Sequence, residues 1–348
     1  MPTKIKVHEE DRDDEYGTLR KEIDVINVPS IETPTKCIKK LETPIPPSAR
    51  INEITKKINL RTIDAFQEGE VLPRDLRIRF MDNKLNLTIF DLMFDSVPSY
   101  EITKALSNYW YVCSENTLIL PTVKSALLKE DKKWSLKRIS KCVAFFENLI
   151  DLAEMKNFKP FIGTIPLLPP KFSKPFVKFY LEKGFNAFAI DVGTRDLINH
   201  VADLRSILME INPRVPLNEA FIYACNLGIP RFNVDRARAD DFLSLFAYID
   251  AFGNIFKSRG GGSPDLRNIK PKPPKAKQFL RKELNYKLLI DSTQDFTNYN
   301  QREQIKETDL VRELIGVEKM QKYLETKKGV DETAFKHLGY VMEKVKIK

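Results

Sequence analysis

The chain has 348 residues, of which 42% are hydrophobic and 10% aromatic, so it can bury a large core. Its 57 lysine and arginine residues exceed its 48 aspartate and glutamate residues, which leaves a net charge of +9. That surplus fits either an ordinary charged surface or a localised footprint for nucleic acid. Four widely spaced cysteines without a CxxC pair, and three histidines, argue against a structural zinc site and a Ser–His–Asp triad. We expect no metal and no cofactor.

The N-terminus is charged and carries no apolar signal segment, and no apolar run reaches the length of about 18 residues that a membrane span needs. The sequence therefore predicts a reduced, soluble, cytoplasmic protein without a membrane partner.

The first third of the chain has mixed signals. Residues 1–22 are highly charged, and we expect them to be partly disordered. Residues 23–34 look like short strands broken by prolines. Residues 52–60 fit either a short helix or a strand. Residues 76–80 and 85–90 predict two strands joined by a turn.

Strands and helices then alternate. Apolar runs predict strands at 85–95, 117–121, 160–168, 185–191 and 229–235. Helical periodicity, with Ser99, Ser135 and Thr194 as N-caps, predicts helices at 99–110, 134–155, 173–184, 194–211 and 217–228. Near-continuous apolar strands are typical of parallel sheets covered on both faces. The pattern predicts an α/β fold, first a (β/α)8 TIM-like barrel with an N-terminal strand extension and a C-terminal helical tail, and second a doubly wound sheet.

Four parts follow from this pattern. They are a charged N-terminal arm with short strands (1–50), the barrel (51–256), a basic Gly/Pro-rich loop or linker (257–285) and a C-terminal helical segment (286–348). The stretch 257–282 holds nine lysines and arginines against one aspartate. It fits either a flexible linker or a loop that contacts phosphates. In the tail, 311–329 and 332–345 each predict one amphipathic helix.

Three apolar runs end on an acid: Asp95, Asp191 and Asp235. The carboxyl ends of parallel strands line the active-site face of such folds, so these acids are expected at its mouth. Each could instead cap the next helix or pair with a nearby arginine. Two opposed carboxylates suit glycosyl transfer, and they equally suit a divalent cation. The spacing does not separate these chemistries.

Several motifs occur in a familiar order. They are IETP (Ile31–Pro34), FDSVPSYE (Phe94–Glu101), TLILPT (Thr117–Thr122), NFKPFIGTIP (Asn157–Pro166), FNAFAIDVG (Phe185–Gly193) and NPRVPLNEAFIYACNLGIPRFNV (Asn212–Val234). Together they resemble the tRNA-guanine transglycosylase superfamily, which includes the DNA 7-deazaguanine transglycosylases. The resemblance covers about half of the chain.

The resemblance implies a reaction in which a carboxylate displaces a flipped guanine from its ribose, and a 7-deazaguanine base then replaces it. It implies Asp95 and Asp235 as catalytic residues. Implied substrate-binding residues are Ser96, Glu101, Asp191 and Asn233. A flipped base also needs a basic surface for the phosphates of tRNA or DNA, for which the candidates are Lys257, Arg259, Arg267, Lys270, Lys272 and Trp134.

The motifs also depart from the family. The first site motif loses its glycines, Pro166–Leu168 replaces the QGG of the base-binding strand, and Asn233 stands where the family has its nucleophile, with Asp235 two residues later. The chain is therefore either an active transglycosylase with a rearranged site or a non-catalytic relative that binds nucleic acid. Two other interpretations stay open: an unrelated barrel enzyme for a small anionic substrate that uses Asp95, Asp191 and Arg195, and a scaffolding protein. Self-association or a partner subunit is compatible with each.

Overall fold

The computed structural model describes residues 4–13, 16–39, 44–69, 78–94, 97–122, 134–155, 159–228, 235–256, 275–290, 294–317, 319–343 and 345. Its strands are β1 (Lys6–Asp13), β2 (Thr18–Asp24), β3 (Ile31–Thr33), β4 (Thr35–Lys36), β5 (Ile51–Ile58), β6 (Leu85–Leu92), β7 (Leu118–Ile119), β8 (Phe161–Pro166), β9 (Ala187–Asp191), β10 (Phe221–Cys225), β11 (Arg236–Arg238), β12 (Ala251–Phe252), β13 (Lys275–Leu280) and β14 (Asn285–Ile290). Its helices are α1 (Leu60–Gln67), α2 (Tyr100–Val112), α4 (Leu136–Glu154), α5 (Pro170–Glu182), α6 (Val201–Ile211), α7 (Asp240–Leu243), α8 (Thr297–Leu314), α9 (Met320–Glu325) and α10 (Glu332–Met342), with short 3-10 helices η2 (Ile198–His200) and η3 (Ser244–Phe246).

The fold is mixed α/β and is built on a six-stranded parallel sheet with the order β4-β12-β10-β9-β8-β7. β5 and β6 form a separate parallel pair. Two isolated parallel bridges, Ile38–Asn52 and Asp91–Thr122, connect this pair to the strands at the two edges of the larger sheet. Within the described ranges no sheet is closed by continuous ladders.

The parallel strands are buried on both faces, as their near-continuous apolar sequences predict. One set of side chains, including Phe90, Phe188 and Ile222, packs against the helices in what we call the helix-facing cluster. The alternate set, including Leu87 and Ala189, forms a separate cluster. Its described members come from strands and loops, so we call it the strand-only cluster. The two-residue period of a strand explains this division.

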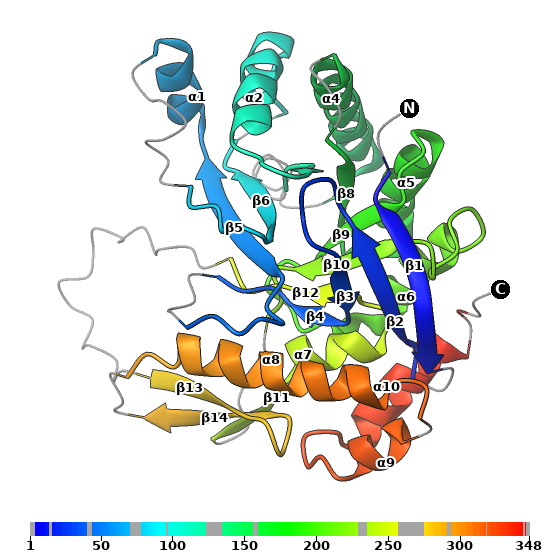
Figure 1. Ribbon diagram of the computed structural model, residues 1–348. Coiled ribbons are helices and arrows are strands. Elements are labelled where there is room, and N and C mark those ends of the chain that lie inside the picture. The colour runs from blue at the N-terminus through cyan, green and yellow to red at the C-terminus, as the bar shows by residue number, and fades with distance from the viewer. Residues whose placement is uncertain are drawn as a thin grey trace, which may run out of the picture.

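The helices form a continuous layer outside the strands. Helices α1, α2, α4, α5, α6 and α10 pack in that order, each against the next, and Figure 1 shows the first four of them side by side. Ser99 and Ser135 cap α2 and α4 by accepting hydrogen bonds from the amides of Ile102 and Arg138. No helix in the described ranges is long and apolar enough to cross a membrane.

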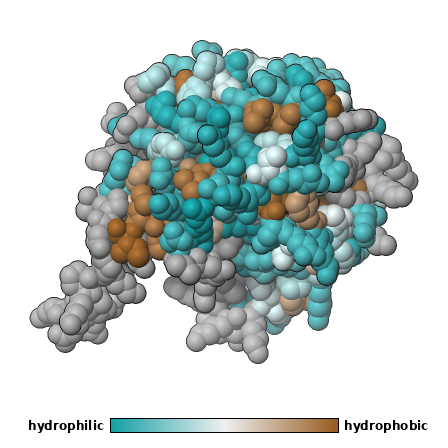
Figure 2. All heavy atoms as spheres, turned by 90° about the horizontal axis from the view of Figure 1, so that it is seen from below, coloured by the Kyte–Doolittle hydropathy of each residue, from teal (hydrophilic) through white to brown (hydrophobic). Residues whose placement is uncertain are grey.

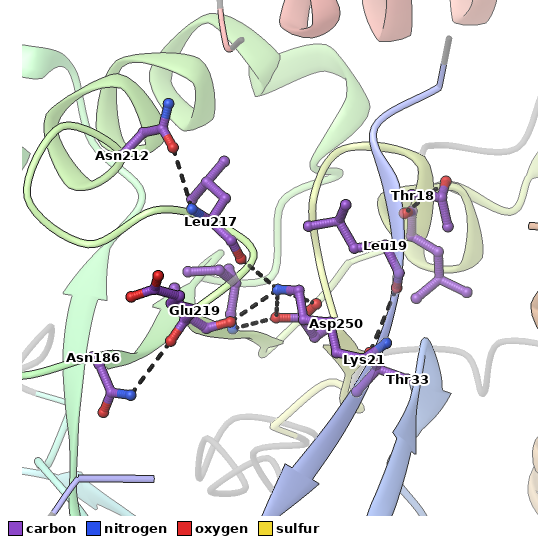
Figure 3. A network of polar contacts seen from close by, with 12 residues as sticks. Thr18, Leu19, Lys21, Thr33, Asn186, Asn212, Leu217, Glu219 and Asp250 are labelled. Carbon is purple, nitrogen blue, oxygen red and sulfur yellow. Dashed lines mark hydrogen bonds and ion pairs between the residues drawn. The ribbon is translucent and has the colours of Figure 1, made fainter. Parts of the chain in front are cut away.

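The antiparallel sheet β1-β2-β3 covers the amino ends of the parallel strands. Its residues Ile23 and Ile31 join the strand-only cluster. Lys21 on β2 is fully buried, and its Nζ donates to the carbonyl oxygens of Leu217 (2.6 Å) and Ala220 (2.8 Å). The same ammonium contacts both carboxylate oxygens of Asp250, at 2.7 Å and 2.9 Å (Figure 3). This ion pair connects the N-terminal sheet to the starts of β10 and β12.

The C-terminal part adds the antiparallel sheet β11-β14-β13, against which α8 lies (Figure 1). Asn300 on α8 satisfies the edge of β13: it accepts from the Phe279 amide at 2.7 Å and donates to the Lys277 carbonyl at 2.7 Å. Arg238 on β11 bonds both Asp240 and Asp331, the N-cap of α10. Seen from below in Figure 2, the coloured surface is mostly hydrophilic, and its apolar residues form several separate patches.

The predicted alternation of strands and helices between residues 85 and 211 is confirmed at most positions. Residues 51–58 form a strand, and the charged N-terminus contains β1 and β2. The strand predicted at 76–80 is not formed over its described part, 78–80.

Three predicted helices differ from the structure, the first in kind and the other two in their bounds. Residues 217–228 hold strand β10, because FIYAC is buried on both faces and Asn226 adopts a positive φ of 55°. Thr194 has φ 65° and cannot begin a helix, so α6 begins at Val201 after η2. Gly316, with φ 78°, separates α8 from α9 where one helix was expected. The predicted basic linker is in part strand β13, and residues 257–274 lie outside the described ranges.

The Lys21→Met variant should lower the free energy of unfolding by about 3–5 kcal/mol, because it leaves the Asp250 carboxylate buried without its partner. Adding Asp250→Asn should restore much of the loss, since no lone charge then remains in the interior. Urea denaturation measures both effects. The exposed Lys104→Met change on α2 is the control, and an equally large loss there would contradict the assignment.

The Asp240→Asn variant tests the junction between β11 and α10. Burial raises the pKa of Asp240 to about 6, although the hydrogen bond and charge of Arg238 lower it. The folded state therefore holds this proton more tightly than the unfolded chain does. The stability that this provides is present below about pH 4 and is lost as the pH rises through 6. Denaturation from pH 4 to 7 should show the variant gaining stability relative to wild type, whereas the exposed control Asp64→Asn should show no such trend.

Candidate active site at the carboxyl ends of the strands

Polar side chains gather where the parallel strands end. Glu53 lies in β5, Asp191 ends β9, Asn226 follows β10 and Asn254 follows β12. Hydrogen bonds join Glu53 to Asn254 and Asn226 to Asp191. Since the carboxyl ends of parallel strands meet on one side of a sheet, this is the candidate site, which we call the mouth.

Glu53 is the most deeply buried acid of the mouth, with 1% of its surface exposed. Its Oε2 accepts hydrogen bonds from the Tyr223 hydroxyl at 2.5 Å and from the Asn254 amide at 2.9 Å. Its Oε1 is buried and has no hydrogen-bond partner among the residues that the structure describes. A buried acceptor without a partner costs stability, so this atom requires an explanation.

Gly253 makes room for the Glu53 carboxylate. A Cβ at position 253 would lie 1.9 Å from Glu53 Oε2 and 2.6 Å from the Tyr223 hydroxyl oxygen. Any side chain there would displace the acid from its two donors.

Lys36 adds a buried cation beside this acid. Its Nζ donates to the Gly253 carbonyl at 2.9 Å and to Asn254 Oδ1 at 3.0 Å, and it lies 4.6 Å from the centroid of the Phe252 ring. Burial lowers the pKa of Lys36, and the nearby charge of Glu53 opposes that shift. Lys36 and Glu53 therefore hold Asn254 from two sides.

Asp191 has its own set of donors. It accepts from the Gly193 amide at 2.9 Å and from Asn226 Nδ2 at 3.0 Å, and 5% of its surface is exposed. Asn226 in turn accepts from the Phe256 amide at 3.1 Å. The acid is thus tied to the segments that follow β10 and β12, and it caps its own turn rather than a helix.

The thiols and the phenol of the mouth are not nucleophiles. Burial raises the pKa of Cys37 and of Cys225 well above the usual range, and the charge of Glu53 adds to the effect at both thiols. Burial likewise raises the pKa of Tyr223, so its hydroxyl keeps the proton that it donates to Glu53.

Exposure increases along β5 toward its carboxyl end. Glu53 is buried, Thr55 is half-buried and Lys57 is exposed, and all three occupy alternate positions of the strand. Lys57 pairs in register with Asp91 of β6, whose Oδ1 accepts from the Thr122 hydroxyl at 3.1 Å. The mouth therefore opens beyond Glu53. Across the described ranges, no group of three or more His, Cys, Asp or Glu side chains is arranged to hold a metal ion.

The predicted site residues occupy different places. Of these, Asp191 belongs to the mouth. Glu101 is exposed on the first turn of α2, and Trp134 is half-buried against the helix-facing cluster. Asp235 is exposed in a turn before β11, whose partner β14 belongs to the antiparallel sheet, so it does not end a parallel strand. The other predicted residues lie outside the described ranges: Asp95, Ser96, Asn233, Lys257, Arg259, Arg267, Lys270 and Lys272.

The predicted site residues do not include Glu53, Lys36, Tyr223 or Asn254. Glu53 lies in a stretch for which helix and strand were equally compatible, and Tyr223 lies in one predicted as a helix. The positions that alternate with Glu53 are Ile51, Thr55 and Lys57, so no apolar period singled out this acid. No family model and no curated protein matches this chain.

The Gly253→Ala variant should lower the free energy of unfolding by about 1–3 kcal/mol through overpacking against Glu53. The loss should shrink when Glu53→Ala is added, because the clashing carboxylate is then gone. A double-mutant cycle measured in urea gives the coupling. Gly339→Ala in α10 is the matched control, since its Cβ would have nothing within 4 Å. Additive effects of Gly253→Ala and Glu53→Ala would contradict this geometry.

Proposed function

We propose that the parallel strands form a (β/α)8-type barrel. The six strands of the large sheet and the β5–β6 pair give eight parallel strands, and the bridges Ile38–Asn52 and Asp91–Thr122 lie at both junctions. The amides of Ile38 and Thr122 donate to the Ile51 and Phe90 carbonyls at 2.9 Å and 2.8 Å, which supports a ring. In this arrangement the strand-only cluster fills the barrel, and the mouth lies at its catalytic end.

We further propose that the protein is transglycosylase-like and binds a guanine-type base of tRNA or DNA at this mouth. The observation that carries the proposal is the pair of buried acids Asp191, which ends β9, and Glu53, whose side chain accepts from the Asn254 amide just beyond β12. Carboxylates are the natural acceptors for the adjacent N–H groups of a guanine edge. The resemblance to the transglycosylase superfamily gives the same ligand class.

The proposed reaction is base exchange. A carboxylate oxygen attacks C1′ of the nucleoside, and the C1′–N9 bond breaks with its electron pair passing to the guanine, which leaves after protonation. The incoming 7-deazaguanine-type base then gives up its N9 proton, attacks C1′ and releases the carboxylate. The resemblance assigns Asp95 to the base and places Asn233 at the position of the nucleophile, so the attacking acid that we propose is Asp235, two residues later.

A second candidate is a non-catalytic relative that binds nucleic acid. It is favoured by the position of Asp235, which is exposed beside the antiparallel sheet and not at the end of a parallel strand. The carboxylate of Asp191 is also already held by Gly193 and Asn226.

Covalent trapping tests the reaction. The full chain is incubated with guanine-containing tRNA or DNA and a 7-deazaguanine base, denatured, and examined by gel and mass spectrometry. We expect a protein–nucleic acid adduct, because an ester to C1′ survives denaturation. The adduct should disappear in the variant that lacks the nucleophile, and Asp235→Ala, Asp191→Ala and Asp95→Ala are compared with the surface control Glu154→Gln.

The other outcomes are distinct. Binding that weakens steeply with salt but gives no adduct would assign the protein to the non-catalytic candidate. An adduct that survives Asp235→Ala would remove Asp235 from the mechanism. Absence of both adduct and binding would contradict the proposed function and leave the barrel proposal untouched.

A further inference from the structure

We propose that Glu53 is the residue that selects the bound base, and that its Oε1 accepts a hydrogen bond from the exocyclic amino N–H of a guanine-type ligand. The inference rests on the proposed function and adds to it a residue and a ligand edge. No sequence motif pointed to this acid.

The two oxygens of Glu53 are used unequally. Oε2 has two donors, the Tyr223 hydroxyl and the Asn254 amide, at 2.5 Å and 2.9 Å. Oε1 has none among the described residues, although the side chain is 99% buried. By contrast, both oxygens of the buried Asp250 are hydrogen-bonded. The Oε1 atom is therefore a fixed hydrogen-bond acceptor that has no donor among the described residues.

Glu53 lies on the face of β5 that leads to the mouth. Glu53 shares its face of β5 with Thr55 and Lys57, along which exposure increases toward the mouth. Asp191 on β9 pairs in register with Cys225 of β10, two residues beyond the Tyr223 that holds Glu53. Both acids are therefore next to β10: Glu53 bonds Tyr223, and Asp191 lies beside Cys225. Asp191 is the second carboxylate of the mouth.

Neighbouring groups hold the acid in place. The Gly253 backbone lies against the carboxylate, since a Cβ there would come within 1.9 Å of Oε2, and Lys36 bonds Asn254, whose amide donates to the same oxygen. A fixed acceptor can discriminate ligands, because a ligand without the matching donor leaves the carboxylate buried and unpaired. Guanine presents N1–H and an amino group on one edge. Hypoxanthine lacks that amino group, and adenine has an acceptor at N1.

The experiment is calorimetric titration of the full chain with guanine, hypoxanthine and adenine. Wild type should prefer guanine to the other two bases. Glu53→Gln keeps the shape and can still accept from Tyr223 and Asn254, but it turns the unpaired acceptor into a donor. It should bind guanine at least about tenfold more weakly, since hydrogen bonds to charged groups are the stronger class. It should also lose the preference for guanine over hypoxanthine.

The control is Glu154→Gln on the exposed end of α4, which should leave affinity and preference unchanged. Melting curves of Glu53→Gln separate loss of binding from loss of folding.

The outcomes separate this inference from the function on which it rests. If wild type binds none of the bases, the proposed function fails. If wild type prefers guanine and Glu53→Gln keeps both affinity and preference, the role of Glu53 is overturned and the proposed function stands. If Glu53→Gln does not fold, the affinities of the wild-type chain for guanine and hypoxanthine are compared instead. Equal affinities would overturn the role of Glu53.

Discussion

The buried ion pair between Lys21 and Asp250 is the interaction on which the arrangement of the strands depends. Both charges lose their hydration, which is costly unless every donor and acceptor is paired. Here Lys21 also reaches the carbonyls of Leu217 and Ala220, and Asp250 also accepts from the Ile222 amide at 2.7 Å (Figure 3). The pair therefore fixes the N-terminal sheet, the start of β10 and the start of β12 relative to one another.

The strands β10 and β12 are also held on the side of the mouth, where the acid is Glu53. Glu53 joins the Tyr223 hydroxyl in β10 to Asn254 just after β12, and Asn226 just after β10 donates to Asp191. Polar contacts therefore lie beyond the carboxyl ends of both strands as well as before their amino ends. The apolar strand-only cluster lies between the two polar layers.

Sequence patterns predicted the parts of this structure that depend on local or periodic signals. The apolar run that ends at Asp191 and the serine caps of α2 and α4 were of this kind. β10 was predicted as a helix, because alanine, leucine and a final glycine imitate one, whereas burial on both faces decides for a strand. Glu53 could not be identified as a site residue, because its partner Tyr223 is 170 positions away in the chain.

The two buried acids Asp250 and Glu53 differ in how many of their oxygens have hydrogen-bond partners. Asp250 has a cation and a backbone amide, and its role is complete within the fold. Glu53 has donors on one oxygen only, and it lies beside Gly253, where a Cβ would come within 1.9 Å of that oxygen. Replacing Glu53 by glutamine would keep those donors but would leave the buried Lys36 beside a neutral side chain, so the fold itself makes use of the acid. In the proposed complex, a donor from the bound base would in addition complete the hydrogen bonding of Oε1.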